Sequence, residues 1–549
     1  MPLQKNQVLT LQVERLSSDG SGVAHSPEGE TVFIPGAAPG DEARVRIVKD
    51  CKRYAFGILD EVLKPSPDRI PVDCAVAGPC GGCSLRHLDY AAELRAKQEN
   101  VADAFARIGG LDVPVLPIVG SPEIDRYRNK VQFPVGTDKA GRPCIGFYAG
   151  RTHRIVPCPD CRLQPGVLNE IGNTLCAFFA EKGIHPYNEE TGKGLVRHIF
   201  LRRGAHSGQI MVCLVCTRAK LPSAEELCTR LKEAFPDIVT ILLNVNAKNT
   251  NVILGSETHT LYGQGYIEDT LCGVPVQLGP LSFYQVNTLA AEQLYGIAAE
   301  YAQLTPDDLL LDLYCGMGTI GLSMADHCRE LVGVEIVPEA IESAKANAAR
   351  MGAAVSAKSR FFCADAGQAA AQLAAEGLHP DVVMLDPPRK GCDEATLSAV
   401  VRMAPRRVVY VSCNPATAAR DAAWLEQNGY HAEKVQPVDL FPRTKHVETV
   451  VLLSKGEVDS KKIRVEFSLE DMDMSEFQDG ATYPQIKAYV LEHSGLKVSN
   501  LYISQIKRKC GIEVGKNYNL PKSEDSRQPQ CPPEKEKAIR EAFKYFGMI

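Results

Sequence analysis

The stretch Leu309-Leu-Leu-Asp312-Leu-Tyr314-Cys-Gly316-Met-Gly318 decides the fold of the C-terminal half of this chain. It predicts a buried strand, a glycine-rich turn and then a helix. Glu335 lies 19 residues beyond Gly316, after a second apolar run at 331–334. In such a unit the glycines admit the backbone of a nucleotide, and the carboxylate accepts from its ribose hydroxyls. The stretch therefore indicates a nucleotide-like ligand at the end of the first strand.

The identity of this ligand is open between two classes. The run 316–321 satisfies the G-x-G-x-x-G pattern of dinucleotide sites, so NAD is one candidate. Asp312, four residues before the first glycine, instead favours the S-adenosylmethionine version of the turn.

Strands and helices alternate beyond this turn. This alternation predicts a doubly wound, mostly parallel α/β sheet of the Rossmann type over residues 280–455. Strands are expected at 359–363, 381–385, 407–411 and 446–453, and helices at 338–351, 366–375, 394–403 and 417–428. Asp365 follows the third strand and is expected near the adenine end of the ligand.

Two further strand ends carry candidate chemistry. Val408-Val-Tyr-Val-Ser412-Cys413-Asn414-Pro415 places Cys413 at the carboxyl end of a strand, where open α/β sheets bind their ligands. Packing is the alternative, because free cysteine is among the most buried residue types. Asp386-Pro-Pro-Arg389 follows the preceding strand, and its two prolines make a rigid loop.

The composition is that of an ordinary globular protein. The 549 residues, 45% hydrophobic and 23% charged, are enough for three or four domains. Neither a signal peptide nor a transmembrane helix is expected, so we place the protein in the cytoplasm. The net charge of −6 does not point to nucleic acid, although local basic patches matter more than the sum. In a cytoplasmic chain, 19 cysteines argue for metal ligation, catalysis or packing rather than disulfides.

Residues 1–65 predict a small OB-like β-barrel. Strands are expected at 8–13, 31–34, 43–48 and 54–59, with glycine turns between them. Three segments resemble the TRAM domain, a barrel appended to RNA-modifying enzymes. They are Asp19-Gly-Ser-Gly-Val-Ala, Val32-Phe-Ile-Pro-Gly-Ala-Ala-Pro-Gly40 and Tyr54-Ala. Its basic residues suit contact with a phosphate backbone or a solvated charged face: Arg44, Arg46, Lys49, Lys52 and Arg53.

Residues 66–279 predict an α+β central domain with a cysteine array. Cys74, Cys80 and Cys83 form C-x5-C-x2-C, and Cys158-Pro-Asp-Cys161 follows much later. Three thiolates with a distant fourth suit zinc or an iron–sulfur cluster, and the spacing does not choose between them. Basic residues interleave with aromatic ones in Arg126-Tyr-Arg-Asn-Lys130-Val-Gln-Phe133, a pattern that suits RNA contact.

From the barrel to about residue 454, the chain resembles the RNA 5-methyluridine methyltransferases. The specific parts are 282–287, 311–318, 386–391, 411–417 and Asp439-Leu-Phe-Pro-Arg-Thr444-Lys-His446-Val-Glu448. The resemblance implies a nucleophile at Cys413 and a proton acceptor at Glu448. It also implies a [4Fe-4S] cluster, with Cys161 chosen over Cys158 as the fourth ligand, and, with the barrel, the 23S ribosomal RNA branch. The implied S-adenosylmethionine site uses Gln285, Tyr314, Glu335 and Asp386, together with Gly316, Gly318 and Asp365 of the nucleotide-binding unit.

The chemistry agrees with this assignment. C5 of uracil is too weak a nucleophile for a sulfonium methyl group until a thiolate adds at C6. After methyl transfer, a base must remove the C5 proton before the thiol can leave. The target uridine must be exposed, so we expect structured RNA with a looped or flipped nucleotide.

Other functions remain as alternatives. They are a tRNA uridine-C5 methyltransferase and a non-catalytic RNA-binding or ribosome assembly protein. An amino-directed DNA methyltransferase is disfavoured, because such enzymes usually place an aromatic residue where Arg389 stands and need no thiol. No membrane and no protein partner is implied, and we expect a monomer.

Residues 456–549 form an extension outside the resemblance. A basic segment at 460–464 and an acidic one at 469–477 precede helices expected at 483–493, 501–509 and 533–546. The first two helices suggest a helix-turn-helix unit, and the second ends in Lys507-Arg-Lys509. Nucleic-acid contact and a small packing domain are equally consistent with this pattern.

Overall fold

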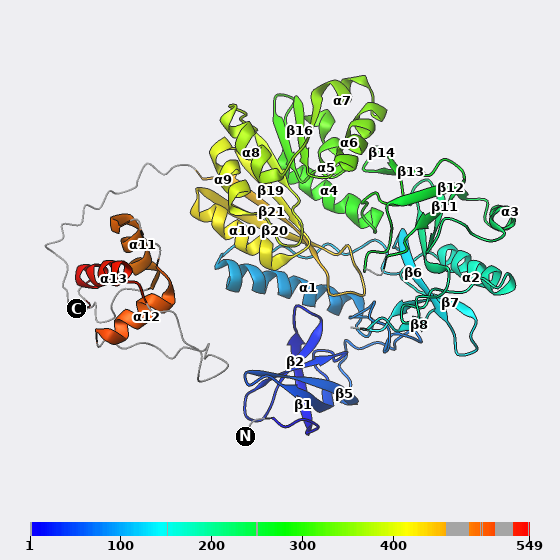
Figure 1. The fold of residues 1–549 in the computed structure, drawn as a ribbon, viewed down its shortest axis with the longest axis horizontal. Coiled ribbons are helices and arrows are strands. Elements are labelled where there is room, and N and C mark those ends of the chain that lie inside the picture. Colours follow the sequence, from blue (N-terminus) through cyan, green and yellow to red (C-terminus); the bar gives the residue numbers. More distant parts are fainter. Residues whose placement is uncertain are drawn as a thin grey trace. The chain divides into compact units, whose positions relative to one another are not determined.

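The computed structural model describes residues 3–150, 152–248, 251–456, 483–494, 496, 498–510, 531–546 and 548. It divides into two compact units, Met1–Val458 and Asp459–Ile549. The first unit contains the β-sheets, coloured from blue to yellow in Figure 1, and the second contains three helices in orange and red. Within these described ranges, no helix is both long and apolar enough to cross a bilayer.

The first sheet is a closed five-stranded barrel in the order β1-β2-β3-β5-β4. Its strands are β1 (Val8–Leu16), β2 (Ser21–His25), β3 (Thr31–Pro35), β4 (Glu42–Asp50) and β5 (Tyr54–Lys64). Alternate residues such as Val32, Ile34 and Val45 fill its interior. The expected barrel is confirmed. The strand β2 was not predicted, because its glycine-rich sequence favours a turn.

A cysteine-bearing segment leads from the barrel to α1 (Tyr90–Ala104), which continues as a π-helical turn, Phe105–Gly109. The Asp89 carboxylate caps α1 by accepting from the backbone N–H of Ala92. Although α1 precedes the central sheet in sequence, its end at Val101 and Phe105 packs into the core of the later α/β sheet. Figure 1 shows α1 alongside the yellow strands and helix of that sheet.

The central sheet has seven strands in the order β12-β11-β10-β9-β6-β7-β8. They are β6 (Lys130–Thr137), β7 (Pro143–Tyr148), β8 (Ile155–Pro157), β9 (Val196–Arg203), β10 (Ile210–Cys216), β11 (Ile238–Val245) and β12 (Glu257–Tyr262). The helices α2 (Gly166–Glu181) and α3 (Ala224–Ala234) cover its apolar face. A separate hairpin of β13 (Ile267–Leu271) and β14 (Val274–Leu278) leads to the α/β sheet.

The α/β sheet has seven strands in the order β17-β16-β15-β18-β19-β21-β20. They are β15 (Leu309–Leu313), β16 (Glu330–Glu335), β17 (Ser359–Cys363), β18 (Val382–Leu385), β19 (Arg407–Ser412), β20 (Tyr430–Val438) and β21 (Glu448–Lys455). The strands from β15 to β19 are parallel, and β21 is antiparallel to both of its neighbours. Apolar residues form a core on each face. The predicted doubly wound sheet is confirmed.

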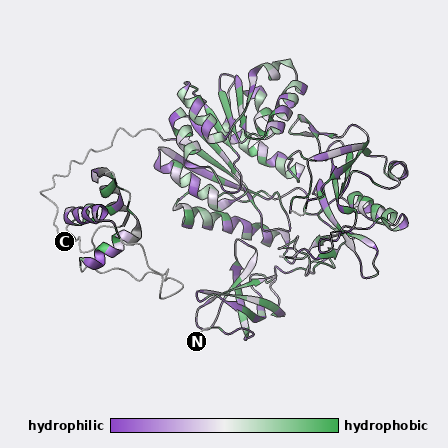
Figure 2. Ribbon diagram, viewed as in Figure 1, coloured by the Kyte–Doolittle hydropathy of each residue, from purple (hydrophilic) through white to green (hydrophobic). Residues whose placement is uncertain are grey.

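The helices of this domain are α4 (Thr288–Ala302), α5 (Thr319–Ser323), a short 3-10 turn (Ala325–His327), α6 (Pro338–Arg350), α7 (Ala353–Lys358), α8 (Ala366–Ala375), α9 (Glu394–Met403) and α10 (Pro415–Gln427). The sheet strands are predominantly hydrophobic, whereas the helices alternate hydrophobic and hydrophilic residues (Figure 2). One expectation needs correction, and one strand was missed. The run Ser282-Phe-Tyr-Gln285-Val-Asn287 predicts the opening of a helix, but the helix begins only at Thr288, where the side chain of Asn287 caps it. The strand β20 was not predicted.

The C-terminal unit contains α11 (Tyr483–Ser494), α12 (Asn500–Lys509) and α13 (Pro533–Tyr545), close to the ranges where helices were expected. Ile486, Ile503, Ile539 and Phe543 form its core. The basic end of α12 is used partly inside the unit, because Lys507 is buried and Lys509 pairs with Glu536 of α13 at 2.7 Å. The charged segments predicted at 460–464 and 469–477 lie outside the described residues.

Candidate active site

The glycine-rich turn after β15 lies at the carboxyl end of the α/β sheet. Tyr314, Gly316 and Gly318 have left-handed φ angles of 64°, 55° and 79°. A Cβ on Gly318 would lie 3.2 Å from the Cβ of Ala344, so this position requires glycine for space as well as for conformation. Gly316, by contrast, has open space where a Cβ would stand, so a ligand can approach the backbone of the turn at this position.

Glu335, at the end of the neighbouring strand β16, faces this turn. Its Oε2 accepts from the backbone N–H of Gly316 at 3.2 Å, and its Oε1 accepts from those of Ile336 and Val337 at 2.8 and 3.0 Å. The side chains of Ile336 and Val337 are exposed beside it. A carboxylate next to an exposed apolar surface suits a ribose with its attached base.

Asp365 lies at the end of the next strand, but its position also has a structural use. Its Oδ1 accepts from the backbone N–H groups of Gly367 and Gln368, both at 3.1 Å, and so caps α8. A contact with the adenine ring therefore stays a prediction.

Two carboxylates lie in the interior behind the turn. Asp312 is buried, and its Oδ2 accepts from the N–H of Gly321 at 3.0 Å, whereas Oδ1 lacks a partner among the described residues. Burial raises the pKa of Asp312 to about 8, and the nearby Asp386 and Glu335 add to this rise. Desolvation likewise raises the pKa of Asp386 to about 7. A cationic ligand would relieve this excess of negative charge.

The turn that carries Cys413 is fastened to the Asp386–Gly391 loop. Asn414 Nδ2 donates to the carbonyl of Arg389 at 3.0 Å, and Thr417 Oγ1 donates to the same carbonyl at 3.4 Å. Ser412 and Asn414 also exchange hydrogen bonds, Asn414 N–H to Ser412 Oγ at 3.1 Å and Ser412 Oγ–H to Asn414 O at 3.2 Å. The predicted thiol and the predicted Asp386 loop thus form one structural element.

The sheet register brings Cys413 and Glu448 together. Ser412 of β19 pairs with Thr449 of β21, so Cys413 and Glu448 are the next residues at the adjoining ends of these two strands. The Glu448 carboxylate lies close enough to the Cys413 thiol to act on its pKa. Burial raises the pKa of the Cys413 thiol, Glu448 and Asp386 raise it further, and the Arg389 guanidinium lowers it. The structure therefore assembles a half-buried thiol, a cation and two carboxylates from three separate sequence motifs.

Glu448 itself is almost inaccessible to solvent. Its side chain is 6% exposed. Burial holds its pKa well above the ordinary range, Asp386 raises it further, and Arg389 lowers it. A carboxylate in this setting accepts a proton readily, which is the property needed in a general base.

Gln285 lies in the loop between β14 and α4, which the central domain holds in place. Asn129 Nδ2 donates to the Gln285 carbonyl at 2.8 Å, and the Asn129 N–H donates to the carbonyl of Val286 at 2.8 Å. The guanidinium of Arg202 donates to the carbonyl of Ser282 at 2.7 Å. The neighbouring Phe283 side chain is 73% exposed, so this loop offers an aromatic face to solvent.

The predicted metal ligands line a single cavity of about 240 Å³. Its walls include Cys74, Cys80, Cys83, Cys158 and Cys161, with Arg86 and Arg128 nearby. A hydrogen bond from Cys158 lowers the pKa of Cys161 to about 7, opposed by burial, and the two arginines lower it further. Burial instead raises the pKa of Cys83 to about 12.

The donor set around this cavity consists of cysteine thiols. Among the described residues, no three His, Cys, Asp or Glu side chains lie close enough to hold one metal ion. Five thiols around one cavity nevertheless match the chemistry of an iron–sulfur centre, which is larger than an ion and takes four cysteines.

Comparison with known proteins identifies the family. A model of the tRNA (uracil-5-)-methyltransferase family matches residues 207–456, and a TRAM domain model matches residues 2–59. An uncharacterized RNA methyltransferase of Halalkalibacterium halodurans is 44% identical over 453 residues, which is 82% of this chain and 98% of that protein. The chain belongs to the RNA 5-methyluridine methyltransferase family.

Further relatives agree with this membership. An uncharacterized RNA methyltransferase of Bacillus cereus is 42% identical over 457 residues, 83% of this chain and 98% of that protein. The crystal structure of the Pyrococcus abyssi tRNA (uracil-54, C5)-methyltransferase with S-adenosyl-L-homocysteine has 27% sequence identity and a TM-score of 0.65. It covers 81% of this chain and 100% of its own. This chain therefore has the fold of an S-adenosylmethionine-dependent methyltransferase. Of the two ligand classes left open by the glycine-rich turn, S-adenosylmethionine is supported over NAD.

Several residues that shape the methyltransferase site were not predicted. Arg389 was named only as a departure from DNA methyltransferases, yet it lies beside the thiol. Asn414 and Thr417 fasten the two loops, and the sequence signal for them was Asn-Pro at a strand end. Asn129 and Arg202 act on the Gln285 loop from 80 or more residues away in the sequence, so no local pattern indicates them.

Proposed function

We propose that the protein methylates C5 of a uridine in 23S ribosomal RNA, with Cys413 as nucleophile and Glu448 as general base. The observation that carries this proposal is the pairing of β19 with β21, which ends at Ser412 and Thr449 and so brings the adjoining thiol and buried carboxylate near each other. Neither group alone is diagnostic. Their pairing at the ligand-binding edge of an α/β sheet matches a reaction that needs one addition and one proton removal.

The residues divide the reaction into two halves. The Cys413 thiolate bonds to C6, and the C5=C6 electron pair moves so that C5 becomes nucleophilic. S-adenosylmethionine supplies a methyl group on a sulfonium sulfur, and C5 takes this group while the sulfur keeps the bonding pair. Glu448 then removes the C5 proton, the C5=C6 bond forms again, and the C6–S bond breaks to regenerate the thiolate.

The surrounding charges support each half. Arg389 stabilises the Cys413 thiolate. A cationic methyl donor would favour the ionised forms of Asp312 and Asp386, whose pKa values are raised by burial. In this proposal Gln285, Tyr314, Glu335 and Asp386 hold the donor together with Gly316 and Gly318, and Asp365 contacts its adenine.

The substrate class has two candidates. The TRAM barrel together with the cysteine array resembles the 23S ribosomal RNA branch, which is our first choice. Likeness to a solved tRNA (uracil-54, C5)-methyltransferase favours tRNA as the second.

We propose further that Cys74, Cys80, Cys83 and Cys161 hold a [4Fe-4S] cluster. Four thiolates compensate the charge of such a cluster, and the shared cavity supports this assignment. Iron and sulfide analysis with visible absorption of anaerobically purified protein tests it. Loss of the absorption in Cys83→Ser supports the assignment, whereas stoichiometric zinc without sulfide contradicts it.

Covalent trapping tests the central proposal. RNA containing 5-fluorouridine cannot release C5 fluorine as a cation, so a true adduct survives denaturation. We expect an adduct with ribosomal RNA that requires both Cys413 and S-adenosylmethionine. An adduct with tRNA alone would keep the mechanism and change the substrate. Folded protein that binds S-adenosylmethionine but traps neither RNA would contradict the mechanism.

A further inference from the structure

The segment Asp439–Val447, called here the catalytic loop, joins β20 to β21 and ends directly at Glu448. Side chains from elsewhere in the chain hold its backbone at four consecutive residues. Their bonds are Asn287 Nδ2 to Leu440 O (3.1 Å), Lys97 Nζ to Phe441 O (3.1 Å), Tyr127 OH to Pro442 O (2.9 Å) and Arg443 N–H to Glu93 Oε1 (2.7 Å). An irregular loop with this many external partners has a defined path.

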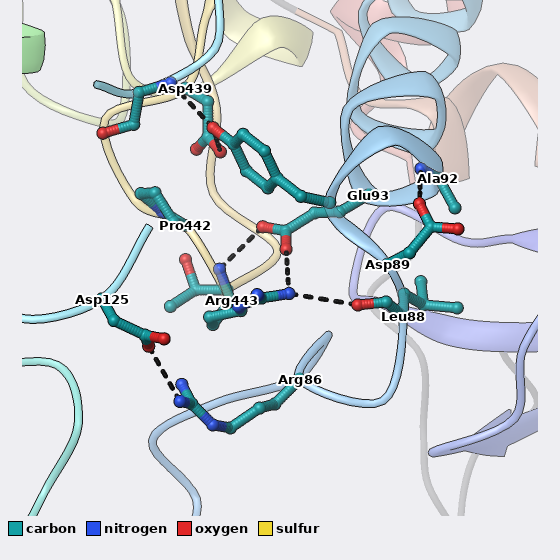
Figure 3. A network of polar contacts seen from close by, with 12 residues as sticks. Arg86, Leu88, Asp89, Ala92, Glu93, Asp125, Asp439, Pro442 and Arg443 are labelled. Atoms are coloured by element: carbon teal, nitrogen blue, oxygen red, sulfur yellow. Dashed lines mark hydrogen bonds and ion pairs between the residues drawn. The ribbon is translucent and has the colours of Figure 1, made fainter. Parts of the chain in front are cut away.

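Buried charges on α1 provide the strongest of these contacts. Lys97 Nζ lies 2.7 Å from both Glu93 Oε1 and Asp439 Oδ1, and these three side chains are 1%, 0% and 0% exposed. Tyr90 OH donates to Asp439 Oδ2 at 3.0 Å. Because positions 90, 93 and 97 share one face of a helix, α1 presents them together to the loop. Figure 3 shows the neighbouring contacts, in which the Glu93 carboxylate faces the backbone N–H and the guanidinium of Arg443.

The contacts continue through the loop toward Glu448. Asp439 Oδ1 accepts from the N–H of Phe441 at 3.0 Å, and Thr444 Oγ1 donates to the carbonyl of Phe441 at 2.8 Å. Thr444 Oγ1 in turn accepts from the N–H of His446 at 3.4 Å, two residues before Glu448. A displacement of the Asp439 side chain would therefore be transmitted through these hydrogen bonds to the start of β21.

Arg443 is the most constrained residue of the catalytic loop. Its φ is 68°, an unfavourable conformation for a residue with a Cβ. Glu93 holds its N–H, and the N–H groups of Ser84 and Leu85 donate to its carbonyl at 3.0 and 3.1 Å. Its guanidinium donates to the carbonyl of Leu88 at 3.1 Å and lies 3.8 Å from Glu93. The unfavourable backbone conformation of Arg443 persists because hydrogen bonds hold both its N–H group and its carbonyl in place.

We propose that Glu93 and Lys97 are positioning residues for proton removal from C5, acting through the catalytic loop on Glu448. A buried ion pair adds little net stability compared with apolar residues of similar size, but it imposes a direction on the groups it joins. Here the joined groups are α1, Asp439 and Arg443. The inference rests on the proposed function, because it assigns to Glu448 the base role given above.

The two halves of the reaction separate this role from general stabilisation. Adduct formation on 5-fluorouridine RNA requires Cys413 and methyl transfer but no proton removal. Turnover of ordinary RNA requires all of these steps. Loss of positioning should slow turnover alone and let the methylated covalent complex accumulate on ordinary RNA.

The test compares Lys97→Met and Glu93→Gln with Arg95→Met in the full chain. Arg95 lies on the exposed side of α1, 56% exposed, and pairs with Asp68 at 2.7 Å, so it is a matched control. We expect the buried variants to slow turnover by about 10- to 100-fold, a part of the 10²–10⁴ that a placed base supplies. Their rate of fluorouridine adduct formation should stay within about twofold of the control, since the addition half is untouched.

A milder pair of variants covers the case in which Lys97→Met does not fold. Tyr90→Phe removes one hydrogen bond to Asp439, and Lys97→Arg keeps the charge, so we expect a smaller defect in the first and partial rescue in the second. Equal losses in both assays, or no difference from Arg95→Met, would overturn the positioning role. If wild-type protein forms no Cys413-dependent adduct, the proposed function fails instead, which the same experiment shows separately.

Discussion

The cofactor turn and the catalytic loop are both irregular, yet they are held in different ways. The turn at 314–318 is fixed by neighbours in its own domain, such as Cys315 N–H to Val334 O at 3.0 Å and Gly316 N–H to Glu335. The catalytic loop takes its partners from residues more than 150 positions earlier, including Lys97 and Asn287. Local sequence therefore determines the first element, whereas tertiary structure determines the second.

The largest expected effect falls at the end of the catalytic loop. Glu448→Gln removes the proposed base, so turnover should fall by about 10²–10⁴-fold. Adduct formation on 5-fluorouridine RNA should continue, and a methylated complex should accumulate on ordinary RNA. Gel mobility of denatured complexes measures both. Equal loss of adduct formation in Glu448→Gln would show that this carboxylate acts before proton removal.

The next effect concerns the stability of the loop's support. Lys97→Met leaves Glu93 and Asp439 buried without their cation, so the free energy of unfolding should fall by about 3–5 kcal/mol. Denaturant titration measures this change. In the exposed control Arg95→Met the change should stay below about 1 kcal/mol. Similar values for the two variants would contradict a strongly coupled network.

This destabilisation should depend on pH. Burial raises the pKa of Glu93 to about 7, and Lys97 opposes that rise. Removal of Lys97 should therefore raise the pKa of Glu93 further. A carboxyl group whose pKa is higher in the folded state loses its favourable contribution as pH rises through that value. The loss in free energy of unfolding caused by Lys97→Met should therefore be smaller near pH 5 than near pH 8.

A smaller effect is expected in the cofactor turn. Gly318→Ala forces a residue with a Cβ into φ of 79° against Ala344, a strain of about 1–3 kcal/mol. Calorimetry should show S-adenosylmethionine binding weakened by about tenfold, since 1.4 kcal/mol corresponds to this factor. Gly377→Ala, at φ of 82° in open space outside the turn, is the control. The affinity of Gly377→Ala for S-adenosylmethionine should match that of the wild type.

The smallest effect separates the charge of Arg389 from its backbone role. Arg389→Met keeps the carbonyl that Asn414 holds but removes the cation that lowers the pKa of Cys413. Adduct formation should then require a pH higher by about one unit, because the nearby positive charge favoured the thiolate. Arg360→Met serves as control, because Arg360 lies on the edge strand β17 with its side chain 49% exposed. An unshifted pH profile would exclude electrostatic activation by Arg389.

The comparison also explains what the sequence could predict. Leu309–Gly318 carries its own strand, turn and helix signals, and the structure places them as expected. The same holds for Cys413, whose strand and break are adjacent. By contrast, β20 contains Pro437 and no clean alternation, so its pairing with β21 depends on the finished sheet.

Long-range partners were beyond sequence reasoning. The helical period and the Ala, Glu, Lys and Arg content of residues 90–108 predict a helix, which the structure contains as α1 and its π-helical end. Nothing in this period shows that Glu93 and Lys97 face a loop near residue 440. Their spacing of four residues is also that of an ordinary surface ion pair. Only the packing of α1 against the later sheet makes the pair a buried contact.

The attachment of Arg443 to Ser84 and Leu85 has a consequence for biosynthesis. Apart from Asn287, the side chains and backbone groups that hold the catalytic loop are made early, between residues 84 and 129, and the loop itself emerges more than 300 residues later. Its closure is thus one of the longest-range steps in the folding of this chain, and such contacts form late. A nascent chain stopped before residue 448 contains its barrel and cysteine array but lacks the proposed base.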